Sequence, residues 1–221
     1  RAGAEDTSFI EGLKRIERQW WILIIVLPAT QQLTGINAVV LYGPRIIKNG
    51  GFSNFLLITF LCIGLWNLLS VFVSTALIER VGRRTLMLVA LGGMAASLLG
   101  LGVIFAALPV GHPAKGISAL LSIMSYLFFF EVGPGPLFFV MATESFPERI
   151  KSNALALANA GTWIYNILVV FLFPALTSAF GDPKEPKTGD TMPGTATMFT
   201  VFAVVSATCL YVIWRKVPSR K

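Results

Sequence analysis

The sequence predicts an all-α, polytopic membrane protein, and three observations lead to this fold class. First, 55% of the 221 residues are hydrophobic and only 13% are charged, with a mean hydropathy of +0.72. A soluble domain of this length needs a polar surface, which this composition does not supply. Second, mainly apolar stretches long enough to cross a bilayer follow one another along the chain. Third, the basic residues lie in short clusters between these stretches, a pattern that argues against nucleic acid as a partner.

Six transmembrane helices are predicted, at residues 20–47, 55–78, 85–108, 117–142, 152–180 and 195–214. About 20 apolar residues are enough to cross the hydrocarbon core, so the long first and fifth helices are expected to be kinked or strongly tilted. Residues 1–19 are expected to form a cytoplasmic amphipathic lead-in, residues 20–214 the six-helix bundle, and residues 215–221 a cytoplasmic basic tail.

The distribution of lysine and arginine predicts the orientation in the membrane. Most of these residues precede the first helix, follow the last helix, or lie near residues 80–84 and 149–151. The opposite side carries only Arg45, Lys48, Lys115, Lys184 and Lys187. Because loops rich in lysine and arginine stay on the cytoplasmic side, both termini are predicted to be cytoplasmic. The plasma membrane is the expected location, with an organelle inner membrane as the alternative.

Three amides in the first helix indicate a polar site within the membrane. In a regular helix, Gln31, Gln32 and Asn37 would not point the same way, but Pro28 and Gly35 favour a local break that lets them converge on a cavity. Amides both donate and accept hydrogen bonds, which suits a neutral polyol. The alternative is that they hold neighbouring helices together by hydrogen bonds.

The second and fifth helices also carry polar or amphipathic groups. Asn67 lies in the second helix, and Asn159, Trp163 and Asn166 lie in the fifth. Each of these alone is compatible with simple packing or with hydrogen bonds between helices.

The fourth helix contains the strongest local signal. Gly133, Pro134, Gly135 and Pro136 interrupt its hydrogen-bond ladder in the middle of the membrane. Transporters use such discontinuities at substrate sites and moving joints. Glu131 lies at the edge of the break, where an ionised carboxylate requires water or hydrogen-bond donors; a purely structural carboxylate with a partner is the alternative.

Opposite charges lie in two loops on the predicted cytoplasmic side. Residues 79–84 include Glu79, Arg83 and Arg84, and residues 144–151 include Glu144 and Lys151. Such residues can form ion pairs that open and close with a conformational change, or serve only to anchor the topology.

No catalytic chemistry is expected. The sequence contains one histidine, His112, in a loop with proline and glycine, and two cysteines, Cys62 and Cys209, within apolar stretches. It shows no nucleophile–base pair and no cluster of metal ligands, so we expect no enzyme activity, no metal site and no cofactor.

Four motifs in a fixed order resemble those of sugar porters, the hexose transporters of the major facilitator superfamily. They are residues 31–37 (QQLTGIN), Asn67 with residues 79–84 (ERVGRR), residues 131–136 (EVGPGP) and residues 144–147 (ESFP). The resemblance covers nearly the whole chain and corresponds to the C-terminal, six-helix half of such a transporter. It therefore implies one half of a major facilitator fold, built as a 3+3 inverted repeat.

The resemblance also implies roles for individual residues. The residues implied to line a hexose pocket are Gln31, Gln32, Asn37, Asn67, Glu131, Phe139 and Trp163. Those implied to take part in gating are Tyr42, the 133–136 break, and the charged residues Glu79, Arg83, Arg84, Glu144 and Lys151.

Three positions depart from the family pattern. Phe139 stands where the family often has tryptophan, and Thr162 stands where it often has asparagine. Lys151 stands where arginine is usual, which removes the two-pronged contact that arginine offers to a carboxylate.

Two hypotheses for function follow. The first is transport of a hexose or similar monosaccharide by alternating access, together with a complementary N-terminal half in the same polypeptide, a separate chain or a second copy. The second is a half-transporter retained as a structural subunit of a larger membrane complex.

Overall fold

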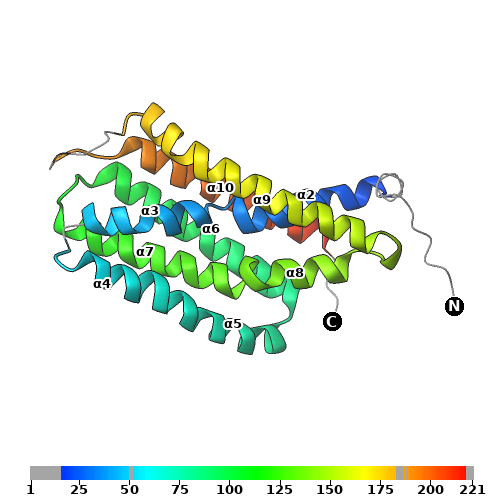
Figure 1. Cartoon of the computed structure of the whole chain (residues 1–221). Coiled ribbons are helices and arrows are strands. Elements are labelled where there is room, and N and C mark those ends of the chain that lie inside the picture. Colours follow the sequence, from blue (N-terminus) through cyan, green and yellow to red (C-terminus); the bar gives the residue numbers. More distant parts are fainter. Residues whose placement is uncertain (1–15, 50–51, 183–186, 188, 218–221) are drawn as a thin grey trace.

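A computed structural model of the chain describes residues 16–49, 52–182, 187 and 189–217. These residues form a bundle of helices that run along a common axis (Figure 1), and no strand occurs among them. The bundle contains six helical stretches that are long and apolar enough to cross a membrane. The predicted fold class and the six transmembrane helices are confirmed.

Three of the spans are interrupted and three are continuous. The first span consists of α2 (Arg18–Gln32) and α3 (Ile36–Asn49). The second consists of α4 (Phe55–Thr59), the π-helical segment η1 (Phe60–Leu65) and α5 (Trp66–Val81). The fourth consists of α7 (Pro113–Val132) and α8 (Pro134–Ser145). The continuous spans are α6 (Arg83–Ala107), α9 (Glu148–Ala179) and α10 (Pro193–Lys216).

The break in the first span is centred on Gly35. Its φ of +93° lies in the left-handed region, which residues with a Cβ rarely adopt. A Cβ at this position would also lie 2.5 Å from the ring of Phe202 on α10. The sequence predicts this break from the glycine among the amides, and the close approach of α10 adds a second reason for glycine.

The break in the fourth span is centred on Gly133. Pro134 begins α8 at the first helical position, where a missing N–H costs no helical hydrogen bond. A Cβ on Gly133 would lie 2.2 Å from the Cβ of Ala90, so α6 and the break are in direct contact. The predicted interruption is therefore present, and it is packed tightly against the third span.

The fifth span is one long helix, and the second contains a segment that was not predicted. Although Pro174 lies within it, α9 is one helix of 32 residues. At 1.5 Å per residue it is about 48 Å long, which exceeds the roughly 30 Å hydrocarbon core. The π-helical segment in the second span was not predicted, because a switch from i→i+4 to i→i+5 bonding leaves no clear sequence pattern.

The third span forms the centre of the bundle. Met87, Leu91, Met94, Leu98 and Leu101 recur every three to four residues along one face of α6 and are completely buried. α6 packs along both α10 and α7, while α2 packs along α9. The second and fifth spans lie farther out. Only 11% and 17% of their most apolar segments are buried, against 44–56% in the other four spans.

The contact between Gly133 and Ala90 generates a test of this packing. We expect Gly133→Ala to lower the free energy of unfolding by about 1–3 kcal/mol, because the backbone and a methyl group of another helix leave no room for the added carbon. The measurement is the Tm of the purified protein in detergent. Gly64→Ala is the control, since a Cβ added at Gly64 would have its nearest neighbour, an atom of the Phe60 ring, 3.8 Å away. Equal Tm values for the two variants would contradict the packing described here.

Candidate functional site

The breaks of the first and fourth spans lie against each other. The side-chain amide of Gln31 donates a hydrogen bond to the carbonyl oxygen of Gly135 at 3.3 Å. In the reverse direction, the buried hydroxyl of Tyr126 on α7 donates to the carbonyl oxygen of Thr34 at 3.1 Å. Each broken helix therefore supplies a side-chain donor to a backbone carbonyl beside the other helix's break.

A carboxylate, Glu131, and the second span also contribute to this junction. Glu131 is half-buried. Its Oε2 lies beside Gly135: a Cβ added to Gly135 would be 3.2 Å from this oxygen. Its other oxygen, Oε1, accepts a hydrogen bond of 2.8 Å from the amide of Asn67 on α5. The structure thus brings Gln31, Asn67 and Glu131 to one junction: Asn67 and Glu131 are 64 residues apart along the chain, and Gln31 is 104 residues from its acceptor Gly135.

The other two predicted amides form a pair across the first break. The Nδ2 of Asn37 at the start of α3 donates to the Oε1 of Gln32 at the end of α2. Both side chains are half-buried. The remaining Nε2 of Gln32 is a donor and the Oδ1 of Asn37 is an acceptor, which is the combination that a sugar hydroxyl can use.

The two predicted aromatic residues lie on the surface of the described bundle. The side chain of Phe139 on α8 is 55% exposed and that of Trp163 on α9 is 63% exposed. The ring of Phe139 contacts Phe138, with centroids 4.7 Å apart. Large aromatic rings at the surface of a span face either lipid or a further protein segment.

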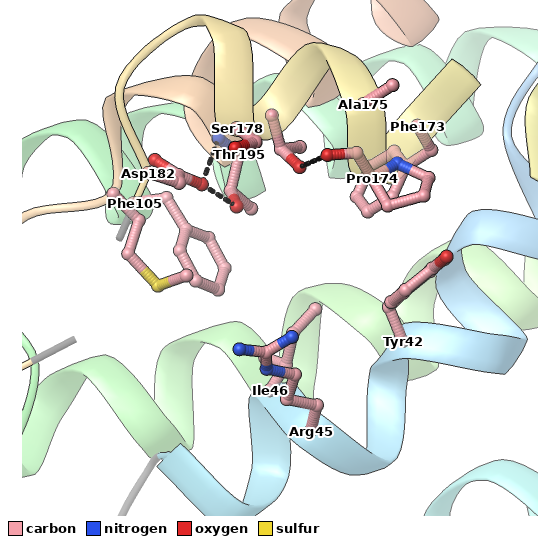
Figure 2. A pocket seen from close by; sticks show the side chains of 12 residues that line it. Tyr42, Arg45, Ile46, Phe105, Phe173, Pro174, Ala175, Ser178, Asp182 and Thr195 are labelled. Carbon is pink, nitrogen blue, oxygen red and sulfur yellow. Dashed lines mark hydrogen bonds between the residues drawn. The ribbon is translucent and has the colours of Figure 1, made fainter. Parts of the chain in front are cut away.

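Tyr42 lies away from the amides. It is on α3 and its ring packs against Phe173 of α9, with centroids 4.8 Å apart. It lines a cavity of about 420 Å³ between α3, α9 and the start of α10 (Figure 2). None of the other predicted site residues lines this cavity.

Charged residues connect the helix ends at the side of the bundle that carries the basic loops. Arg83 at the start of α6 forms an ion pair with Glu144 near the end of α8. Arg84 donates a hydrogen bond of 2.7 Å to the carbonyl oxygen of Trp214 near the end of α10. These contacts tie the third span to the ends of the fourth and sixth.

The remaining predicted charged residues have local partners or lie outside the description. Lys151 pairs with Glu148, one turn earlier on α9, rather than with another span. Arg149 pairs with Glu17 beside the start of α2, a contact that was not predicted. The side chain of Glu79 lies outside the described part of the structure, as do most of residues 1–19 and the end of the basic tail.

Two features of the site were missed at the level of the sequence. Tyr126 was not singled out, although a phenol in the middle of an apolar span needs a hydrogen-bond partner and could have drawn attention. The carbonyl of Gly135 could not be identified as an acceptor, because every residue has one. Among the described residues, no group of three histidine, cysteine, aspartate or glutamate side chains could hold a metal ion.

Six apolar spans, with amides and a carboxylate gathered at two helix breaks, define an integral, multi-pass membrane protein of the transporter class. Residues 2–221 match the family described as "Sugar (and other) transporter". The chain therefore belongs to this family, as the motifs predict.

Individual relatives agree with this assignment. The chain is 34% identical over 204 residues to the rabbit (Oryctolagus cuniculus) solute carrier family 2, facilitated glucose transporter member 3, covering 92% of this chain and 38% of that protein. It is also 34% identical over 194 residues to the glucose facilitated diffusion protein of Zymomonas mobilis, covering 87% of this chain and 38% of the relative. These relatives are transporters and not enzymes.

A solved structure shares the fold. The major facilitator superfamily proton:xylose symporter XylE, bound to 6-bromo-6-deoxy-D-glucose, superposes with a TM-score of 0.75 at 27% identity. The match covers 94% of this chain and 41% of the symporter. The chain thus spans about two fifths of the length of the relatives that it matches.

The hydrogen bond between Tyr126 and Thr34 gives a prediction for the junction of the two breaks. We expect Tyr126→Phe to lower the free energy of unfolding by about 1 kcal/mol, because it removes a buried donor from the carbonyl of the first break. Thermal unfolding in detergent measures the change. Tyr211→Phe serves as the control, since that side chain is exposed on α10. A Tm for Tyr126→Phe that matches the control would show that the hydroxyl does not support the junction.

Proposed function

We propose that the chain is the C-terminal half of a transporter that moves a hexose or a similar monosaccharide across a membrane by alternating access. The observation that carries this proposal is the meeting of Gln31, Asn67 and Glu131 at the break of the fourth span. Polar side chains within a bilayer are energetically costly, and they commonly mark a substrate site. Here they are half-buried, so part of each side chain is accessible.

The same residues suggest how a monosaccharide is held. Gln32, Asn37 and the Gln31–Asn67–Glu131 group present amide and carboxylate groups that can bond several hydroxyls of one sugar. Phe139 and Trp163 would lie against the apolar face of the ring or shield it. The relatives named as glucose transporters, and the symporter bound to a glucose analogue, support a monosaccharide as the substrate.

The breaks provide the places where the bundle can move. α3 and α8 are short segments joined to the rest of their spans at Gly35 and Gly133, so each can change its tilt without breaking a continuous helical ladder. The ion pair of Arg83 with Glu144 joins two helix ends on the side of the basic loops, which we take to be cytoplasmic. Its opening and closing would accompany access from that side.

A complementary six-helix half is part of this proposal. α5 and α9 are much less buried than the other spans, and α9 carries the exposed residues Trp163, Ile167 and Phe171 at four-residue intervals along one face. Since Trp163 is expected to face the substrate, the stripe that it begins would face the second half rather than lipid. The alternative of a structural subunit without transport is not favoured, because the matched relatives are named as transporters.

Uptake of labelled glucose into proteoliposomes that contain the complete native transporter tests the proposed pocket. We expect Gln32→Ala and Asn37→Ala each to lower uptake about threefold to tenfold, because each removes one or two hydrogen bonds to the sugar. Asn54→Ala is the matched control, since this amide lies before α4 and outside both breaks. If both amide variants transported glucose as well as the control at equal protein incorporation, the pocket assignment would fail.

Spin labels test the contact with a second half. In the complete transporter in a bilayer, labels at Ile167 and Phe171 should be much less accessible to dissolved oxygen than labels at Val103 on α6 and Val204 on α10. All four side chains are strongly exposed in the described bundle. Equal oxygen accessibility at the four positions would mean that this stripe of α9 faces lipid.

A further inference from the structure

The cavity beside Tyr42 lies at the end of the bundle opposite the basic loops. Its walls come from the last turns of α3, α6 and α9, from Asp182 after α9, and from the start of α10 (Figure 2). Arg45 lies four residues before the end of α3, and Asp182 lies three residues after the end of α9. In a chain with six membrane spans, the ends of the spans are expected to lie near the lipid headgroups.

Most of the cavity wall is apolar. Phe105, Phe173, Ile46 and Met192 line it, and the rings of Phe105 and Phe173 are buried in the core behind. Its volume of about 420 Å³ falls within the range of ligand-binding pockets. An apolar tail could therefore lie against fixed aromatic surfaces without disturbing them.

Two opposite charges face the cavity from different walls. Figure 2 shows Arg45 on the wall formed by α3 and Asp182 on the opposite wall, beside Thr195. The carboxylate of Asp182 is held in place by the backbone N–H groups of Gly194 and Thr195, at 2.7 and 2.6 Å, and by the hydroxyl of Thr195. Arg45 also interacts within the chain, but a guanidinium has five N–H donors and can bind a phosphate oxygen in addition.

We propose that this cavity binds one zwitterionic phospholipid of the bilayer, with its phosphate on Arg45, its ammonium group toward Asp182 and part of an acyl chain along Phe105 and Phe173. The assignment rests on charge complementarity: a cation and an anion on facing walls match a headgroup that carries both charges. A purely anionic headgroup would satisfy Arg45 but be repelled by Asp182, and an uncharged lipid would satisfy neither.

The bound lipid would also connect moving and fixed parts of the bundle. Arg45 belongs to α3, which lies beyond the break at Gly35, whereas Asp182 is bonded to the start of α10. Between them, the ring contact of Tyr42 with Phe173 already joins α3 to α9. A phospholipid that bridges these walls would hold α3 against α9 and α10.

Native mass spectrometry of the complete protein, delipidated and then supplied with phosphatidylethanolamine, phosphatidylglycerol or diacylglycerol, tests the proposal. We expect phosphatidylethanolamine to be retained best, and Arg45→Ala to reduce its retention about fivefold, while Arg45→Lys keeps most of it. Ala175→Trp should abolish retention without changing any charge, because the added ring fills the cavity.

The control is Val103→Trp, which adds the same ring to the exposed surface of α6, outside the cavity. It should leave phosphatidylethanolamine retention unchanged. Equal retention of the three lipids would overturn the proposal, as would retention in Arg45→Ala and Ala175→Trp that matches the Val103→Trp control. Glucose uptake is a separate measurement, so this outcome is independent of the proposed transport.

Discussion

The contact between the two broken helices is the constraint on which the rest of the structure depends. An interrupted helix in a bilayer leaves backbone carbonyl and N–H groups without their usual partners, and lipid offers none. Here the amide of Gln31 reaches the carbonyl of Gly135, and the hydroxyl of Tyr126 reaches the carbonyl of Thr34. The carbonyl of Thr34, between α2 and α3, thus has a donor from the fourth span, and the bond from Gln31 ties the first span to the start of α8.

Close packing at the junction explains why each break carries a glycine. The break at Gly133 touches Ala90 of α6, and the break at Gly35 touches the ring of Phe202 on α10. A side chain at either glycine would overlap the neighbouring helix. The two breaks thus pack closely on α6 and α10, while Gln31, Asn67 and Glu131 stay half-buried.

Burial is uneven among the six spans: four are largely packed against one another, and two are mostly exposed. The first, third, fourth and sixth spans are 44–56% buried, whereas the second and fifth, which include α5 and α9, expose long apolar surfaces. Apolar exposure alone does not distinguish lipid from protein, but the expected site residue Trp163 lies within the exposed stripe of α9. The proposed role of Trp163 at the substrate site is therefore the argument for assigning this stripe to a protein contact.

The sequence by itself determined the number of spans, their order and the positions of both breaks. It could do so because apolar length and the residues Gly35, Gly133 and Pro134 act locally, through hydrogen-bond ladders and allowed backbone angles. It also drew attention to the polar residues that meet at the breaks, since Gln31, Asn67 and Glu131 are costly within a bilayer wherever they point.

Only the tertiary structure decided which of these groups meet. Asn67 bonds Glu131 and Gln31 bonds Gly135 across 64 and 104 residues, and such pairings depend on how the spans pack, which no local pattern encodes. The same is true of Lys151, whose partner is Glu148 on its own helix, and of the cavity between Arg45 and Asp182. A cavity is the space left by several helix ends, so its shape exists only once those ends are placed.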